Sequence, residues 1–218
     1  MSGHGDGHGH GHSHDCGGHG HNGTEDVPDS ERIAQYSLYA KIDLERVQCL
    51  NEVVDGSGKT VFKPWDQRLQ KEEFVESDAD EELLFNIPFT GVVKLKGVII
   101  IGGQDDSHPS RMKLFKNKPN MSFDDVGMDA EQEFELFPDP QGMLEYSTKV
   151  ARFNNVEHLS IYFPANFGND STLVYYIGLR GDFMEARRHE VTICAYETRA
   201  NIADHKTNIM DGVGHIVK

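Results

Sequence analysis

The stretch that decides the fold runs from Val93 to Gly103 and reads VKLKGVIIIGG. Apolar and charged residues alternate through Val93–Lys96, as in a strand with one buried face. The four residues Val98–Ile101 are all apolar, as in a strand buried on both faces, and the pair Gly102-Gly103 marks a turn. This stretch therefore predicts a buried β-strand that ends at the glycines.

The same period of two recurs along the chain. Further strands are expected around Met112 and Leu114, around Phe134 and Leu136, and at Tyr146–Val150, Leu159–Phe163, Thr172–Leu179 and Glu190–Tyr196. Gly, Pro, Asn and Asp residues separate these segments, and no long helical patterns alternate with them. The arrangement is typical of an all-β antiparallel sandwich.

Helical signals are confined to short segments. Apolar spacing predicts a short helix from Leu44 to about Asn51, with Asp43 as its N-cap. The segment Ser77–Leu84 begins with a capping residue and acids, which favour a helix N-terminus or a tight turn. The single tryptophan, Trp65, is expected to be buried against the core.

Charge excludes several classes of function. The chain has 218 residues, with 36 acidic against 21 basic ones, and a formal net charge of −15. Such a balance argues against binding to nucleic acid or to an anionic membrane surface. No apolar run approaches the roughly 20 residues of a transmembrane helix, and no secretory signal is expected. We therefore expect a protein of the cytosol, and of the nucleus as well.

Cysteine usage agrees with a reducing compartment. The chain has three cysteines and no CxxC pair. Cys49 and Cys194 lie between apolar residues, which predicts buried and inert thiols.

Residues 1–27 form a tail rich in glycine and histidine, which we expect to be disordered because it has almost nothing apolar to bury. Its irregular histidine spacing favours a native tail over a purification tag. Two interpretations remain open, an inert solvated tail and metal buffering; a free amine before Ser2-Gly3-His4 would complete a Cu(II) or Ni(II) site. The candidate metal ligands are His4, His8, His10, His12, His14, Cys16, His19 and His21. Residues 198–218 are predicted to form a polar extension.

No catalytic constellation emerges, so we expect neither an enzyme nor a cofactor. Asp105–His108 could suggest acid–base chemistry but lacks a nucleophile motif, and a polar loop is the better interpretation. The acids of Asp78–Glu82 lack the glycine and the final glutamate of an EF-hand. A basic stripe could dock an acidic partner or simply be a solvated strand face. It consists of Arg111, Lys113, Lys116 and Lys118.

Several segments resemble, in order, those of the PITH domain, the proteasome-interacting module of thioredoxin-like proteins. The resemblance spans roughly residues 30–197 and rests on CLNE (49–52), SDADEELL (77–84), PF (88–89), VKL (93–95), KLFKN (113–117), MSF (121–123) and RFNNV (152–156). It implies a jelly-roll sandwich of the galactose-binding-like type, occupying residues 28–197, and association with the proteasome regulatory particle. The thioredoxin half with its redox CxxC has no counterpart here, so redox activity is not carried over.

The sequence therefore leads to one main hypothesis and one alternative. The main hypothesis is a non-enzymatic, monomeric protein-interaction module, an adaptor or regulator associated with the proteasome. The alternative is a β-sandwich that recognises a glycan or a peptide, for which Trp65-Asp66 is the one pairing of tryptophan with an acid. Metal chelation by the tail is compatible with both.

Overall fold

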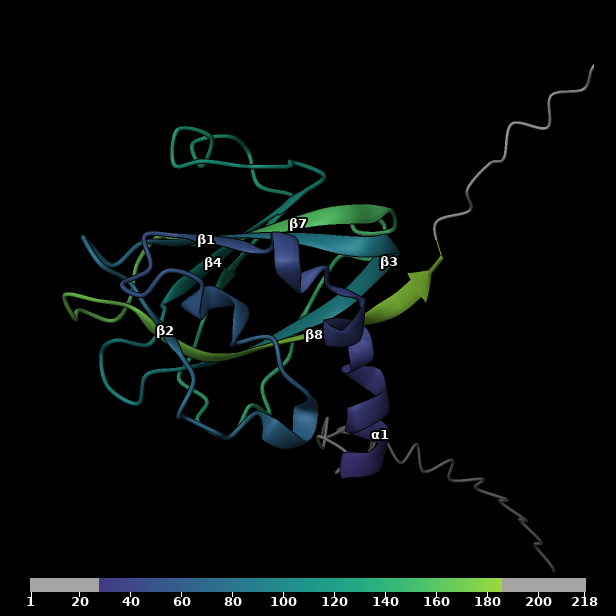
Figure 1. The fold of residues 1–218 in the computed structure, drawn as a ribbon, viewed down its shortest axis with the longest axis horizontal. Helices are drawn as coiled ribbons and strands as arrows, with labels where there is room; N and C mark the ends of the chain where they lie inside the picture. Colours follow the sequence, from purple (N-terminus) through teal and green to yellow (C-terminus); the bar gives the residue numbers. More distant parts are fainter. Residues whose placement is uncertain (1–27, 186–218) are drawn as a thin grey trace, which may run out of the picture. The chain divides into compact units, whose positions relative to one another are not determined.

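The computed structural model describes residues 28–185, which fold mainly as antiparallel β-strands (Figure 1). The strands are β1 (Gln48–Leu50), β2 (Val75–Glu76), β3 (Leu83–Gly102), β4 (Arg111–Lys116), β5 (Gln132–Glu135), β6 (Tyr146–Ser147), β7 (Val156–Phe163) and β8 (Leu173–Met184). The helices are α1 (Asp29–Gln35) and the 3₁₀ turns η1 (Ser37–Lys41), η2 (Leu44–Arg46), η3 (Ser57–Lys59) and η4 (Trp65–Gln67). The all-β prediction is confirmed.

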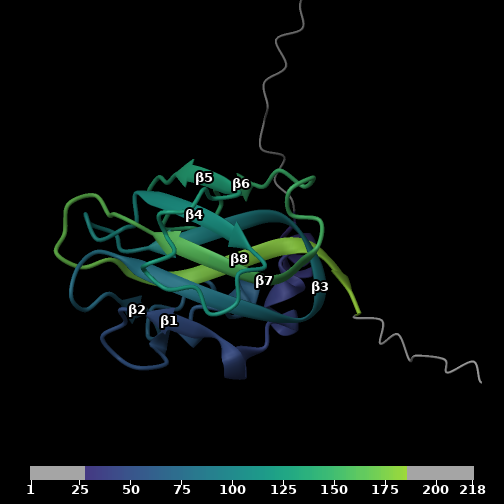
Figure 2. The same ribbon diagram turned by 90° about the horizontal axis from the view of Figure 1, so that it is seen from above.

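β3 is the strand that the sequence singled out, and it belongs to both layers of the sandwich. Its first part, Leu83–Pro88, pairs with β7, and its second part, Val92–Gly102, pairs with β8. The register breaks between the two parts, where Figure 2 shows the strand curving round one end of the fold. One layer therefore holds β1, β3, β7, β4 and β5, and the other holds β2, β8, β3 and β6.

The main core lies between the layers and receives side chains from both parts of β3. Phe85 and Ile87 come from the first part, and Leu95 and Val98 come from the second. Leu95 and Val98 can face the same side only because the register with β8 shifts between Leu95 and Gly97. The bulge explains why the alternation of the sequence changes phase within this strand.

Two smaller apolar clusters lie on the outer faces of the layers. The first consists of Tyr36, Trp65, Ile99, Ile101 and Tyr176, and the second consists of Leu84, Phe115, Met121 and Tyr162. The N-terminal segment contributes to the first cluster, and the long β4–β5 loop contributes to the second. β3 is therefore covered on both faces over much of its length, as its continuous apolar run indicates.

The helix expected from Leu44 to about Asn51 is wrong. A single 3₁₀ turn, η2, is followed at once by β1, which pairs with β3. Asp43 does not cap a helix; its carboxylate accepts a hydrogen bond of 2.7 Å from Arg46 Nε. Sheet pairing therefore prevails over a weak helical pattern. Within residues 28–185, no helix is both long and apolar enough to cross a membrane.

For Ser77–Leu84 the sequence predicted either a helix N-terminus or a tight turn, and the structure has the turn. Asn51 organises this turn, because its side-chain amide donates to the backbone oxygens of Asp80 and Glu82, at 3.3 and 2.7 Å. Asn51 itself adopts a left-handed backbone with a φ of 68°.

Candidate functional site

Several predicted sites lie outside the described residues. These are the metal ligands of the N-terminal tail, Cys194, the strand at Glu190–Tyr196 and the polar extension 198–218. Within residues 28–185, no group of three or more His, Cys, Asp or Glu side chains is arranged to hold a metal ion. The acids of Asp78–Glu82 accordingly form a turn and not a cation site in this part of the chain.

The four cations of the predicted basic stripe do not share one face. Arg111 and Lys113 lie opposite glutamates of β5, and Lys113 Nζ is 3.4 Å from Glu133 Oε1. Lys116 is three residues further along the strand, so its side chain leaves the opposite face, where its ammonium donates to a backbone oxygen. Lys118 lies in the loop beyond β4. Cross-strand pairing therefore neutralises part of the expected positive surface.

The loop Asp105–His108 is a connection between strands, as expected, but its end is buried. His108 is 1% exposed, and its Nδ1 lies 2.7 Å from the oxygen of Pro109. Its Nε2 has no partner among the described residues, and burial lowers the pKa of the imidazole. The geometry makes His108 a packing residue beside Phe167, with the ring centroids 6.1 Å apart.

Trp65 is buried, as predicted, with 1% of its surface exposed. Its indole stacks on Tyr36 at 5.0 Å between ring centroids, and the guanidinium of Arg68 lies 4.0 Å from its centroid on a cation–π contact. Tyr36 and Arg68 therefore both cover the indole ring. Trp65 therefore offers no platform on which a sugar could stack.

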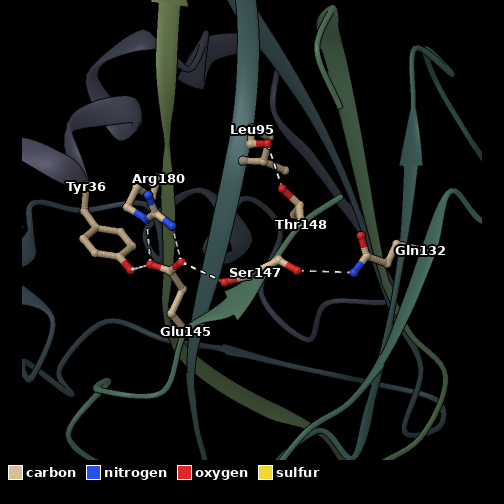
Figure 3. A network of polar contacts seen from close by, with 7 residues as sticks. All are labelled: Tyr36, Leu95, Gln132, Glu145, Ser147, Thr148 and Arg180. Carbon is tan, nitrogen blue, oxygen red and sulfur yellow. Dashed lines mark hydrogen bonds and ion pairs between the residues drawn. The ribbon is translucent and has the colours of Figure 1, made fainter. Parts of the chain in front are cut away.

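A polar network joins Tyr36, in the N-terminal segment, to strands β6 and β8 (Figure 3). The Glu145 carboxylate accepts hydrogen bonds from Arg180 on β8 and from the hydroxyl of Tyr36, with a distance of 2.7 Å from Arg180 Nε to Oε2. Burial alone would raise the pKa of Glu145, but these bonds and the guanidinium charge together lower it. A Cβ at position 97 would collide with this carboxylate, so Gly97 is required where the network crosses β3.

The network continues from Glu145 toward β5 and β3. Ser147 Oγ donates to Glu145 at 3.3 Å, and the Ser147 backbone oxygen accepts from Gln132 Nε2 at 3.3 Å. Thr148 Oγ1 donates to the oxygen of Leu95 at 2.7 Å, as Figure 3 shows. These contacts fix the short strand β6 in place and have the character of a structural clamp.

A groove of about 440 Å³ with exposed apolar side chains lies beside β2, the terminal strand of one layer. We call it the acidic groove. It is lined by apolar side chains of Val53, Val54 and Phe74, by carboxylates of Asp55, Glu72, Glu73 and Glu76, and by Gly56, Ser57 and Thr60. The three apolar residues are 53%, 64% and 39% exposed, which is costly unless something covers them.

One wall of the acidic groove is held by the carboxylate of Glu52. Its two oxygens accept from the backbone nitrogens of Gly56 and Gly58, each at 2.6 Å, and one of them also accepts from Ser57 Oγ at 3.2 Å. Gly56 adopts the left-handed conformation that glycine favours, with a φ of 81°. The turn that carries Val53 and Val54 is therefore preorganised before a ligand binds.

The opposite wall is held by a buried lysine. Lys63 is 6% exposed, and its ammonium donates to the backbone oxygens of Gln70 and Glu73 at 2.9 and 3.4 Å. Burial lowers the pKa of Lys63, and the nearby carboxylates of Glu72 and Glu73 oppose that shift. Phe74 is seated against Tyr175, edge to face, at 6.0 Å between centroids.

The chemistry of the acidic groove suits recognition. Its lining has two hydroxyls, and both are already engaged, because Ser57 Oγ donates to Glu52 and Thr60 Oγ1 donates to the backbone oxygen of Ser57. Apolar side chains flanked by carboxylates fit a peptide segment whose apolar residues alternate with Lys or Arg.

Cys49 lies on β1 and is a free, partly buried thiol. Burial raises its pKa well above the ordinary value, and the charge of Glu52 adds to this. The inert character predicted for this thiol agrees with its surroundings.

Sequence reasoning missed the acidic groove. Its two walls lie about twenty residues apart in the chain and meet where Glu52 pairs with Ser77 and the backbone of Val53 donates to the oxygen of Glu76, at 2.9 Å. A signal was present in the pair Val53-Val54 placed directly before the turn Asp55–Gly58, where exposed polar residues are expected.

Comparison with solved structures identifies the fold. The fold matches the CBM32-1 and CBM32-2 domains of Clostridium perfringens ZmpB, solved in complex with GalNAc, with a TM-score of 0.51 at 9% identity over 72% of this chain and 40% of that one. The protein is thus an all-β jelly-roll sandwich of the galactose-binding-like type, as the sequence resemblance implied.

The sequence model of the PITH domain matches residues 28–200, and the chain belongs to the PITH domain family. It is 60% identical to PITH domain-containing protein GA19395 of Drosophila pseudoobscura pseudoobscura, covering 94% of this chain and 97% of that one. It is 58% identical to PITH domain-containing protein 1 of Homo sapiens, covering 92% of this chain and 98% of that one. The predicted family is confirmed.

Proposed function

We propose that the protein is a non-enzymatic protein-interaction module whose acidic groove receives an apolar and basic segment of its partner. The observation that carries this proposal is an exposed apolar surface between two walls that hydrogen bonds hold in place. Carboxylates surround this surface. Because the walls are preorganised, less conformational entropy is lost on binding. The carboxylates also speed the encounter with a basic segment.

The partner we propose is the proteasome regulatory particle, with the protein acting as an adaptor or regulator in the cytosol and nucleus. Membership of the PITH domain family supports this choice, since the resemblance implies that association. The net charge of −15 also favours a partner surface that is basic over one that is acidic.

The glycan alternative loses the feature on which it rested. Trp65 is buried under Tyr36 and Arg68 and is inaccessible to a ligand. Recognition of a peptide, the other half of that alternative, coincides with the acidic groove.

A binding measurement with purified proteasome regulatory particle tests the proposal. Val54→Asp places a charge on an apolar wall of the groove, and we expect the affinity of the variant to fall about tenfold or more, or about 1.4 kcal/mol. The control is Met128→Asp, which places the same charge on another exposed apolar side chain, at 40%, in the β4–β5 loop. Unchanged thermal unfolding of both variants would establish that the fold is intact.

Equal binding of wild type, Val54→Asp and a Phe74→Ala variant would refute the groove as the contact. Absence of binding by the wild-type protein at low salt under reducing conditions would refute the proteasome as the partner.

A further inference from the structure

A second hollow, of about 260 Å³, has the opposite charge from the acidic groove. We call it the cationic pocket. It lies on the outer face of the layer that contains β3 and β7, and its polar lining consists of Arg46, Asn86, Lys118, Asn120, His158 and Ser160. None of the residues that line it is an aspartate or a glutamate. Three basic side chains thus converge on one hollow of a strongly acidic protein.

The floor of the cationic pocket is a buried polar pair. Asn86 and Ser160 are 7% and 1% exposed, and Ser160 Oγ donates to Asn86 Oδ1 at 2.9 Å. Asn86 Nδ2 in turn donates to the backbone oxygen of Met121 at 2.8 Å. A floor whose polar groups are already satisfied keeps its shape when a ligand arrives.

The loop that carries Lys118 and Asn120 is fixed by Asn117. The backbone nitrogen of Asn117 donates to the oxygen of His158 at 2.7 Å, and its Oδ1 accepts from the backbone nitrogen of Glu157 at 2.8 Å. Asn117 and Asn120 both adopt left-handed backbone angles, with φ values of 55°. The loop is therefore a built feature of the sheet surface.

The cations retain capacity for a ligand. Arg46 uses Nε to bind Asp43 at 2.7 Å, but its side chain is 66% exposed, and this bond leaves the two terminal nitrogens of the guanidinium available. Lys118 lies within electrostatic range of Asp125. Neither carboxylate lines the pocket, so an anion would meet the basic side chains first.

We propose that the cationic pocket binds a phosphate group carried on an organic ligand, namely a phosphorylated side chain of a partner protein. A phosphate monoester brings close to two negative charges and three acceptor oxygens, which match two cations and a neighbouring imidazole better than a single carboxylate does. Pro88 and Pro119 supply an apolar wall, which suits the carbon stem that bears the phosphate. The proposal is independent of the acidic groove.

Nuclear magnetic resonance titration of the full-length protein with N-acetyl-phosphoserine amide tests this proposal. We expect chemical-shift changes at Asn86, Asn120 and His158 that saturate and that weaken as salt rises. The double variant Arg46→Gln/Lys118→Gln should weaken binding at least tenfold, whereas Arg46→Lys should retain part of it. The control Arg111→Gln removes an exposed cation elsewhere and should bind as wild type does.

Three outcomes would overturn the proposal. Inorganic phosphate binding as tightly as the phosphoserine compound would define a site for free phosphate. N-acetyl-aspartic acid amide binding equally well would define a carboxylate site. Shift changes that persist in a correctly folded double variant would place the ligand elsewhere on the protein.

Discussion

At the scale of single residues, His108 makes the stability of the fold depend on pH. Its imidazole is buried, burial lowers its pKa below the ordinary 6.5, and only the weaker effects of Pro109 and Asp139 oppose this. The folded state therefore favours the neutral ring. The stabilisation is complete above pH 6.5 and is lost as the pH falls through the lowered folded-state pKa.

We expect the free energy of unfolding to decrease between pH 7 and pH 5, by at most about 1.4 kcal/mol per pH unit from this one group. Urea unfolding across that range measures it. His108→Asn keeps a donor near the oxygen of Pro109 but removes the titration, so its stability should vary less with pH. A variant that follows the wild-type pH profile would assign the effect to other groups.

Individual residues also show how far the sequence could lead. The burial of Trp65 followed from its size and rarity, but its role in stacking between Tyr36 and Arg68 did not. The acceptor Glu145 lies 109 residues from Tyr36, and nothing local in the sequence marks either as a partner of the other. Contacts between distant segments depend on register, which composition and periodicity do not specify.

At the scale of elements, the segment α1–η1 is attached to the sandwich by side chains and not by sheet pairing. The hydroxyl of Tyr36 donates to the Glu145 carboxylate, which Arg180 also binds. Tyr36→Phe removes that single donor while keeping the ring against Trp65. We expect a loss of about 2 kcal/mol in the free energy of unfolding, since the acceptor is charged and partly buried.

Chemical unfolding of this variant provides the measurement, with Tyr39→Phe in the same segment as its control. Among the described residues the Tyr39 hydroxyl has no hydrogen-bond partner, so its removal should change stability little. Equal effects of the two substitutions would show that the ring, and not the hydrogen bond, holds the segment.

The elements themselves were partly predictable. The alternation in β4 and in β7–β8 and the apolar run of β3 gave the correct strands, because each buries at least one face. The first part of β3 was missed because Asn86 and Pro88 interrupt its apolar pattern. α1 was also missed, and its exposed Ile33, at 46%, shows how little apolar signal it carries.

At the scale of the whole molecule, family and fold could be predicted, whereas the two hollows could not. Ordered motifs along the chain are enough to indicate a PITH domain. The acidic groove and the cationic pocket, in contrast, are assembled from segments that become neighbours only after the sheet forms. Their opposite charges suit two chemically different segments.

The passage of β3 through both layers has a consequence for the way the domain opens. Since one continuous strand supplies hydrogen bonds to β7 and to β8, neither layer can be released without disturbing the other. We expect native-state hydrogen exchange to give Phe85 and Ile100, in the two parts of the strand, the same opening free energy, and to give α1 a lower one. Two distinct opening energies along β3 would show that the layers separate independently.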